Sequence, residues 1–227
     1  MKQLILSVVL GVAIVVSVFA QSEGQSIDYS QPWHIVFFAE VNSSVVSEIT
    51  QVVEAGYLPV GFEIRPGGGL VMLLVRGAMD ELKGWQIAEY TDWNTLEAEI
   101  TGAIQRGYIP MGISRYGDAL SVLWVEAEME LAGWRIATCE DTLTERSRTI
   151  NNLQAQGFTL WGMSVHEELV WMLFLNRTNR EQRVGTISVF SSVATEFQSG
   201  VAEAYNQGWR PNGLGTTEDA LYVCFAR

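Results

Sequence analysis

The side chains that could perform catalysis are few in this 227-residue chain, and they form no complete catalytic motif. His34 and His166 are the only histidines, and His166 lacks the second histidine, four residues on, that a helix-borne zinc site requires. Ser114 and Ser164 each follow a glycine by two residues, but neither has the closing glycine of a nucleophile elbow. We therefore expect no metal site, no cofactor and no serine nucleophile.

Acidic side chains in predicted turns offer a second route to chemistry. Asp118, Glu167 and Asp219 each lie between two apolar runs that read as hairpin strands. They would meet only if the hairpins converge around a cleft, which a hydrolase acting on wall polymer would need. Solvated turn residues that bind nothing are the alternative interpretation.

Aromatic side chains are the third candidates, because indole and phenol rings can stack on sugars or anchor a protein partner. Four of the eight tryptophans, Trp33, Trp85, Trp134 and Trp209, hold repeat positions and are expected in the core or between repeats. Trp93 and Trp161 do not recur, and Tyr116 lies in a predicted turn. We predict these three as contacts for a partner or a sugar.

A repeated block positions all of these residues. It reads Gly, aromatic, any residue, often Pro, any residue, Gly, and its first glycines are spaced 51, 50 and 51 residues apart. Such a period indicates a repeat architecture. The four first glycines are Gly56, Gly107, Gly157 and Gly208.

Each block follows a predicted helix of about 12 residues, a length typical of globular proteins. Apolar residues 11, 7 and 4 positions before the glycine share one helical face, except that Arg146 interrupts it in the third copy. A capping residue stands 13 positions before the glycine, and the glycine itself supplies the left-handed C-cap. The predicted N-caps are Ser43, Asn94, Thr144 and Thr195.

A strand precedes each helix, and a hairpin follows each block, so the unit is β-α-β-β. The last strand of a unit, such as 169–175, is apolar on both faces and must be covered on both. We predict an α+β fold of four tandem repeats, with mostly antiparallel sheets packed together and helices on the outer faces. The predicted repeats are 32–79, 80–128, 129–179 and 180–227, in one contiguous body.

The unit resembles a small bacterial β-α-β-β domain family of unknown function. Gly208-Trp209 and the terminal Leu221 to Arg227 carry the resemblance, as a Gly-Trp pair and an apolar strand that ends in a basic residue. The resemblance implies the same order of elements and brings no catalytic residue with it.

The N-terminus predicts export. Lys2 and the apolar run Leu4 to Phe19 read as a signal peptide over 1–20, followed by a flexible lead-in over 21–31. An uncleaved membrane anchor is the alternative. Two cysteines, Cys139 and Cys224, form a possible disulfide in an oxidising compartment, or else two buried thiols.

Composition limits the partners. The chain holds 14 basic and 26 acidic side chains, a net charge of −12, which argues against nucleic acid and anionic membranes. We predict an exported, periplasmic or extracellular, non-enzymatic repeat protein, a binding or structural module of the bacterial cell envelope. Its partner would be an envelope protein or polysaccharide. The alternatives are the hydrolase above and a carrier of apolar small ligands.

Overall fold

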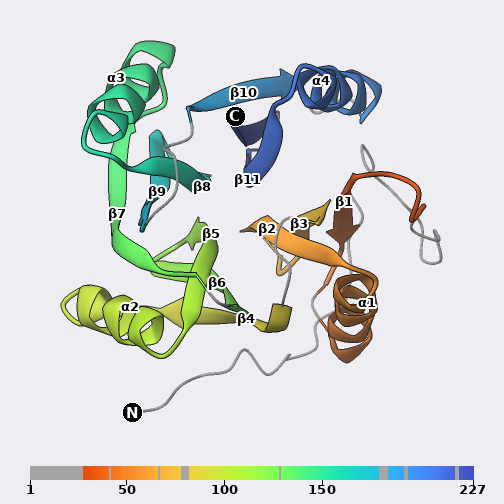
Figure 1. The fold of residues 1–227 in the computed structure, drawn as a ribbon, viewed down its shortest axis with the longest axis horizontal. Helices are drawn as coiled ribbons and strands as arrows, with labels where there is room; N and C mark the ends of the chain where they lie inside the picture. Colours follow the sequence, from red (N-terminus) through yellow and green to blue (C-terminus); the bar gives the residue numbers. More distant parts are fainter. Residues whose placement is uncertain are drawn as a thin grey trace.

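The chain folds into four β-α-β-β units, as the computed structural model shows (Figure 1). It describes residues 28–40, 42–65, 67–77, 82–127, 129–178, 184–191, 194–217 and 220–227. The predicted signal peptide and most of the lead-in therefore lie outside the described residues. In the parts of the chain that are described, no helix is long and apolar enough to cross a membrane.

Each unit contributes a strand, a helix and a hairpin. The elements of the four units, in chain order, are β1 (Trp33–Phe38), α1 (Ser43–Glu54), β2 (Tyr57–Ile64) and β3 (Leu70–Arg76); β4 (Leu82–Tyr90), α2 (Leu96–Gln105), β5 (Tyr108–Tyr116) and β6 (Ala119–Ala127); β7 (Leu131–Glu140), α3 (Leu143–Gln154), β8 (Thr159–His166) and β9 (Leu169–Arg177); β10 (Gly185–Ser191), α4 (Ala194–Asn206), β11 (Arg210–Thr216) and β12 (Ala220–Ala226). The predicted α+β class and repeat order are confirmed.

Every unit forms one three-stranded antiparallel sheet with its last strand in the middle, in the order β1-β3-β2 and its equivalents. The middle strand has neighbours on both sides and is apolar on both faces. In β3, for example, the first six residues are all buried. The helices lie at the outer corners of the molecule, so the sheets pack against one another toward its centre (Figure 1).

The four units close into a ring around a central axis. Strand β2 contacts β5, β5 contacts β8, β8 contacts β11, and β11 returns to β2. The second glycine of each block lies at this contact. A Cβ on Gly112 would come within 3.2 Å of Gly61 Cα, and one on Gly213 within 2.8 Å of Gly162 Cα. Only glycine permits backbones to approach this closely.

A bulge precedes each of these central glycines, because the pairing with the middle strand shifts by one residue there. The extra residue on the bulged strand is Val60, Met111, Trp161 or Asn212, and all four are buried. A β-bulge re-aims side chains locally. The block of the sequence thus encodes a helix end and, five residues later, the joint between units.

Recurrent tryptophans join three of the four units to the helix of the unit before them in the ring, whereas the fourth unit has Gly185 at this position. Trp85 Nε1 donates to Thr50 Oγ1 of α1 at 3.4 Å, and Trp134 Nε1 donates to Thr101 Oγ1 of α2 at 3.2 Å. Trp33 meets Phe197 of α4 edge-on, with ring centroids 6.4 Å apart. This last contact joins the first unit to the fourth and closes the outer layer of the ring.

The helix ends agree with the sequence only in part. The first glycine of every block has a φ between 89° and 92°, as its C-cap role requires. The N-cap predictions are wrong by one or two residues in three units, since the observed caps are Asn42, Thr95 and Thr142. Asn42 and Thr142 cap through their side chains, whereas Thr95 does not. A neighbouring Ser, Thr or Asn serves equally well, so spacing alone does not select the cap.

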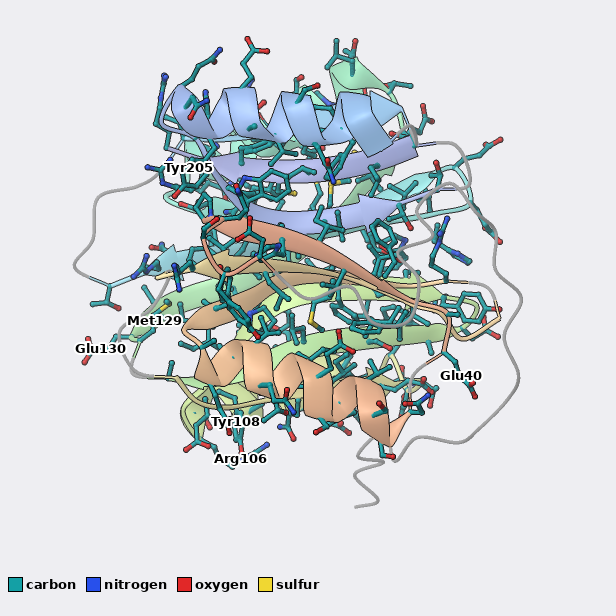
Figure 2. The ribbon with its side chains drawn as sticks, turned by 90° about the vertical axis from the view of Figure 1, so that its right-hand side faces the viewer. Glu40, Arg106, Tyr108, Met129, Glu130 and Tyr205 are labelled. Atoms are coloured by element: carbon teal, nitrogen blue, oxygen red, sulfur yellow. The ribbon has the colours of Figure 1, made fainter. Side chains whose placement is uncertain are left out.

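The two ends of the ring differ in what they carry (Figure 2). One end holds the helix C-termini and the connections between units, where Arg106, Tyr205 and Glu130 lie. The other end holds the helix N-termini and the hairpin turns, with Glu40 just before α1. We call the second the hairpin end, because the β5–β6 turn at 117–118 and the β8–β9 turn at 167–168 open there.

Candidate functional site

A cleft opens between neighbouring hairpins of the second and third units. It encloses about 300 Å³ and is lined by Arg115, Gly117, Asp118, His166, Glu167, Leu169 and Trp171. Strands β5 and β8 are neighbours in the ring, so their turns stand side by side at the hairpin end. A volume of this size is at the lower limit of small-molecule sites. We call this region the hairpin cleft.

Two tryptophans and an arginine pack together at the hairpin cleft, and Trp171 and Arg115 line it. Trp93, between β4 and α2, lies 5.3 Å from Trp171 of β9, centroid to centroid. The Arg115 guanidinium lies 4.9 Å from the Trp93 ring centroid and 5.5 Å from that of Trp171. Trp93 remains 41% exposed, while the Arg115 side chain is only 12% exposed. The arginine therefore holds two aromatic rings together, and one of them faces solvent.

Carboxylates stand on both lips of the hairpin cleft. Asp118 belongs to the β5–β6 turn and Glu167 to the β8–β9 turn, and both side chains are open to solvent, at 109% and 80% exposure. Asp118 Oδ1 lies 3.9 Å from Arg115 Nη2, and Glu167 Oε1 lies 3.9 Å from His166 Nε2. Both contacts are long and both carboxylates are open to solvent, so these contacts contribute little energy. Both carboxylates are consequently available to a ligand.

Glu167 occupies its lip in an uncommon backbone conformation. Its φ is 55°, the only positive value at a non-glycine position among the described residues. The equivalent position of the preceding unit is Gly117, with a φ of 54°. Placing a side chain where a neighbour uses glycine costs about 1 kcal/mol in backbone strain. The turn therefore presents a carboxylate at a position better suited to glycine.

The structure places the three predicted contact residues in different environments. Trp93 packs against Trp171 and Arg115 beside the hairpin cleft, and Tyr116 is 47% exposed at the end of β5, but neither residue lines the cleft. The prediction that Trp161 forms a surface contact is wrong, because it is 6% exposed. It occupies the bulge position of β8, which turns its ring into the core, where Nε1 contacts Met111 Sδ at 3.3 Å.

The structure describes two of the three predicted carboxylates. Asp118 and Glu167 line the same cleft, while Asp219 lies outside the described residues. His166, set aside as a zinc ligand, contributes to the same lining. His34 has a structural setting, since its Nε2 lies 2.9 Å from the Asp28 carbonyl oxygen and burial lowers the pKa of its imidazole.

A second polar cluster lies at the centre of the ring. Glu63 of β2 is 3% exposed, and its Oε1 accepts hydrogen bonds from Ser114 Oγ at 2.9 Å and Ser164 Oγ at 2.7 Å. A backbone hydrogen bond from Thr216 also reaches its carboxyl group. Glu63 thus contacts all three other units.

The serines of this axial cluster each join two units. Ser114 Oγ accepts from the Ile64 amide at 2.9 Å, and Ser164 Oγ accepts from the Arg115 amide at 2.8 Å. These hydroxyls thus connect strands of neighbouring units. Glu63 Oε2 is buried and has no hydrogen-bond partner among the described residues. Burial raises the pKa of Glu63 well above its usual value, and the hydroxyls oppose that effect only in part.

The cysteines stay separate. Cys139 and Cys224 are both buried, and the structure holds both as free thiols. Burial raises the pKa of each thiol. Buried thiols of this kind behave as small hydrophobic groups.

Three residues of these clusters were not predicted from the sequence. Trp171 sits in an apolar run that reads as pure core, and Arg115 reads as an ordinary turn residue. Glu63 had a signal that could have revealed it. It is the one charged residue in the apolar run Tyr57–Ile64, at the position where the other units have Ser114, Ser164 and Gly215.

Comparison with models of known protein families and with curated proteins finds no match. The resemblance of each unit to a bacterial β-α-β-β family stays a prediction. Function must therefore be argued from the clusters themselves.

Proposed function

We propose that the protein is an exported, non-enzymatic binding module of the bacterial cell envelope, and that its hairpin cleft binds carbohydrate. The observation that carries the proposal is the Trp93–Trp171 pair, of which Trp93 is exposed, beside a cleft with acidic lips. The C–H faces of a sugar ring pack against indole rings, and carboxylates accept hydrogen bonds from its hydroxyls. The apolar run Leu4 to Phe19 supports export.

The exposure of the carboxylates favours binding over hydrolysis. General acid catalysis requires a carboxyl group whose surroundings exclude water. Asp118 and Glu167 project into solvent instead. The close glycine contacts between the inner strands likewise leave no room there for the apolar ligand of a carrier.

Binding is tested by titrating soluble fragments of envelope polysaccharide and peptidoglycan into the protein, with calorimetry as the readout. Trp93→Ala removes the exposed ring of the pair and is expected to weaken binding about 5- to 150-fold, since stacking an aromatic ring contributes about 1–3 kcal/mol. Tyr29→Ala is the matched control, because Tyr29 is 44% exposed and packs near Tyr57, away from the hairpin end. Equal affinity of the Trp93 variant and the control would refute the cleft as the binding site.

Export is tested separately. Residues 1–31 are fused to a reporter enzyme that becomes active only outside the cytoplasm. Activity is expected with the native segment, and its loss when Leu10 and Val15 are replaced by arginine, because a charged residue interrupts the apolar run. Inactivity of the native fusion would contradict the envelope location.

A further inference from the structure

Arginines gather at one end of the ring. We call the end with the helix C-termini and the connections between units the connection end, where Arg106 and Tyr205 lie (Figure 2). Six arginines belong to this end by their places at or near the ends of strands and helices: Arg76, Arg106, Arg135, Arg177, Arg210 and Arg227. All except the half-buried Arg177 are exposed, and every unit contributes at least one of these five.

The five exposed arginines have no carboxylate partner among the described residues. The arginine ion pairs in the described parts of the chain lie toward the hairpin end instead, and they are Arg115–Asp118, Arg146–Asp141 and Arg148–Glu145. This contrast occurs in a chain with 26 acidic and only 14 basic side chains. The connection end thus keeps its guanidinium groups available to an external anion.

Aromatic rings hold four of these five guanidinium groups in place. The distances from guanidinium carbon to ring centroid are 5.2 Å for Arg76 on Tyr57, 5.5 Å for Arg135 on Phe158, 4.0 Å for Arg210 on Tyr205 and 4.6 Å for Arg227 on Trp209. A guanidinium that packs on a ring is pre-organised, and its outer N–H groups can still bind a phosphate through two parallel hydrogen bonds.

The connection end is nearly balanced in charge, although the whole chain carries −12. Its described acidic residues are fewer than its arginines: Glu54, Glu126, Glu130 and Glu203. In the sequence, segments 78–83, 128 and 179–183 between the units add four acidic and three basic residues. Much of the excess acidity lies at the hairpin end, in Glu40, Asp92, Asp118, Glu140, Glu167 and Glu168.

Salt separates the two ends electrically. Strand β5 runs from one end to the other over nine residues, which at about 3.3 Å per residue places the ends roughly 25–30 Å apart. The Debye length is about 8 Å at physiological ionic strength, so the acidic hairpin end is screened from a partner at the connection end. The net charge of the chain therefore does not decide what this end binds.

The chain also enters the ring at the connection end. Trp33 begins β1 opposite Val75, and the Arg76 amide donates to the Pro32 carbonyl oxygen at 2.9 Å. The apolar run over 4–19 precedes this point in the sequence. The segment with membrane-like composition thus leads to the arginine-rich end of the ring and not to the acidic one.

We propose that the connection end docks on a membrane surface that contains anionic phospholipids, with its exposed arginines bound to lipid phosphates. Arginines of all four units surround the axis, so a planar array of anions can contact all of them, whereas a linear polymer contacts only those along its path. Tyr205 and Trp209 lie at the same end, and tyrosine and tryptophan are enriched at membrane–water interfaces. Docking in this way leaves the hairpin cleft facing away from the membrane.

The test is co-sedimentation of the full chain with two kinds of vesicle, one of phosphatidylcholine alone and one of phosphatidylcholine mixed with phosphatidylglycerol. The neutral vesicles report any insertion of the apolar N-terminal run, because that insertion does not need lipid charge. The anionic vesicles are expected to bind the protein about five- to tenfold more tightly at low salt, and high salt should reduce this preference.

Variants separate the connection end from the charge of the protein as a whole. Arg227→Gln is expected to weaken binding to anionic vesicles about three- to fivefold, and adding Arg76→Gln should weaken it by a similar factor again. Arg148→Gln is the matched control, because its side chain is 66% exposed but is paired with Glu145 on α3, and it should leave binding unchanged. Urea unfolding of each variant verifies that the ring is intact.

Four outcomes would overturn the proposal. Equal binding to both kinds of vesicle shows insertion of the apolar run alone, and equal effects of Arg227→Gln and Arg148→Gln show attraction to total charge. Binding to soluble polyphosphate but not to anionic vesicles assigns the arginines to a linear polymer. Sedimentation without vesicles that high salt reverses assigns them to a second copy of the chain. Sugar binding at the hairpin cleft is measured separately, so this inference and the proposed function can fail independently.

Discussion

Replacing Glu63 by glutamine should stabilise the ring at neutral and alkaline pH and leave it unchanged in acid. Glutamine keeps the Oε1 acceptor that Ser114 and Ser164 use, but it carries no ionisable group. Burial is the largest influence on the pKa of Glu63. In the folded protein it raises this pKa well above the usual value of 4.5. The protonated acid and the amide are thus close equivalents, and only the ionised acid differs.

The sign of the pH dependence follows from proton binding. Below the unfolded pKa, both folded and unfolded chains hold the proton, and the wild-type protein has its full stability. As pH rises toward the folded pKa, the unfolded chain releases its proton first, so the free energy of unfolding falls by up to about 1.4 kcal/mol per pH unit. The hydrogen bonds from Ser114, Ser164 and Thr216 limit the loss. Because the rise in the pKa of Glu63 is large, we expect Glu63→Gln to have a higher free energy of unfolding than the wild type at pH 8.

The assay is urea unfolding followed by tryptophan fluorescence at a series of pH values, for the wild type, Glu63→Gln and Glu54→Gln. Glu54 is an exposed residue at the end of α1, so its variant controls for the loss of one carboxylate. The difference between the wild type and Glu63→Gln should be near zero at pH 4 and grow with pH. Parallel curves, or a Glu63→Gln protein that is less stable than the wild type at pH 8, would refute a buried neutral acid.

Three further predictions concern the ring and its thiols. Gly112→Ala should lower the free energy of unfolding by about 1–3 kcal/mol, because its Cβ would lie 3.2 Å from Gly61 Cα. Gly84→Ala is the control, since a Cβ there would have no atom within 4 Å, and it should change the free energy of unfolding little in the same urea titration. Ser164→Ala should lower the free energy of unfolding by about 1–3 kcal/mol, since it leaves the Arg115 amide without its side-chain acceptor and removes one donor to Glu63. Ser47→Ala, on exposed surface, is the control. Equal unfolding midpoints of the two variants would contradict a role of Ser164 in joining the units. Cys224 should react with a thiol reagent only as the protein unfolds, because burial raises the pKa of its thiol; labelling at the rate of a free peptide thiol would show an open core.

The order of elements in a unit can be predicted from the sequence because the same pattern occurs four times. One apolar helix face or one hairpin is weak evidence, but four copies at 50 or 51 residues fix the order of elements. The left-handed glycines Gly56 and Gly107 are identifiable for the same reason, since their role depends only on the local backbone. The N-caps are less predictable, because two or three neighbouring residues at each helix start can all accept the same amide hydrogen.

Ring closure depends on contacts that no single repeat contains. In the sequence the glycines at the axis are only the last residues of the repeated block, and only the neighbouring unit reveals that a Cβ would collide there. Trp161 illustrates the same limit. Its residue type does not recur, yet its position does, since Val60, Met111 and Asn212 are the buried bulge residues of the other units.

The departures from repeat symmetry are the best guide to function in this molecule. Symmetry alone would place equivalent residues at every hairpin turn and four equivalent residues on the axis, and packing would explain all of them. Glu63 on the axis and the Trp93, Asp118 and Glu167 group at the hairpin end break that equivalence in different places. Glu63 is inaccessible and contacts the other three units, so its chemistry acts on the stability of the ring. The hairpin cleft is accessible and belongs to two units only, so its chemistry is directed outward, toward a ligand.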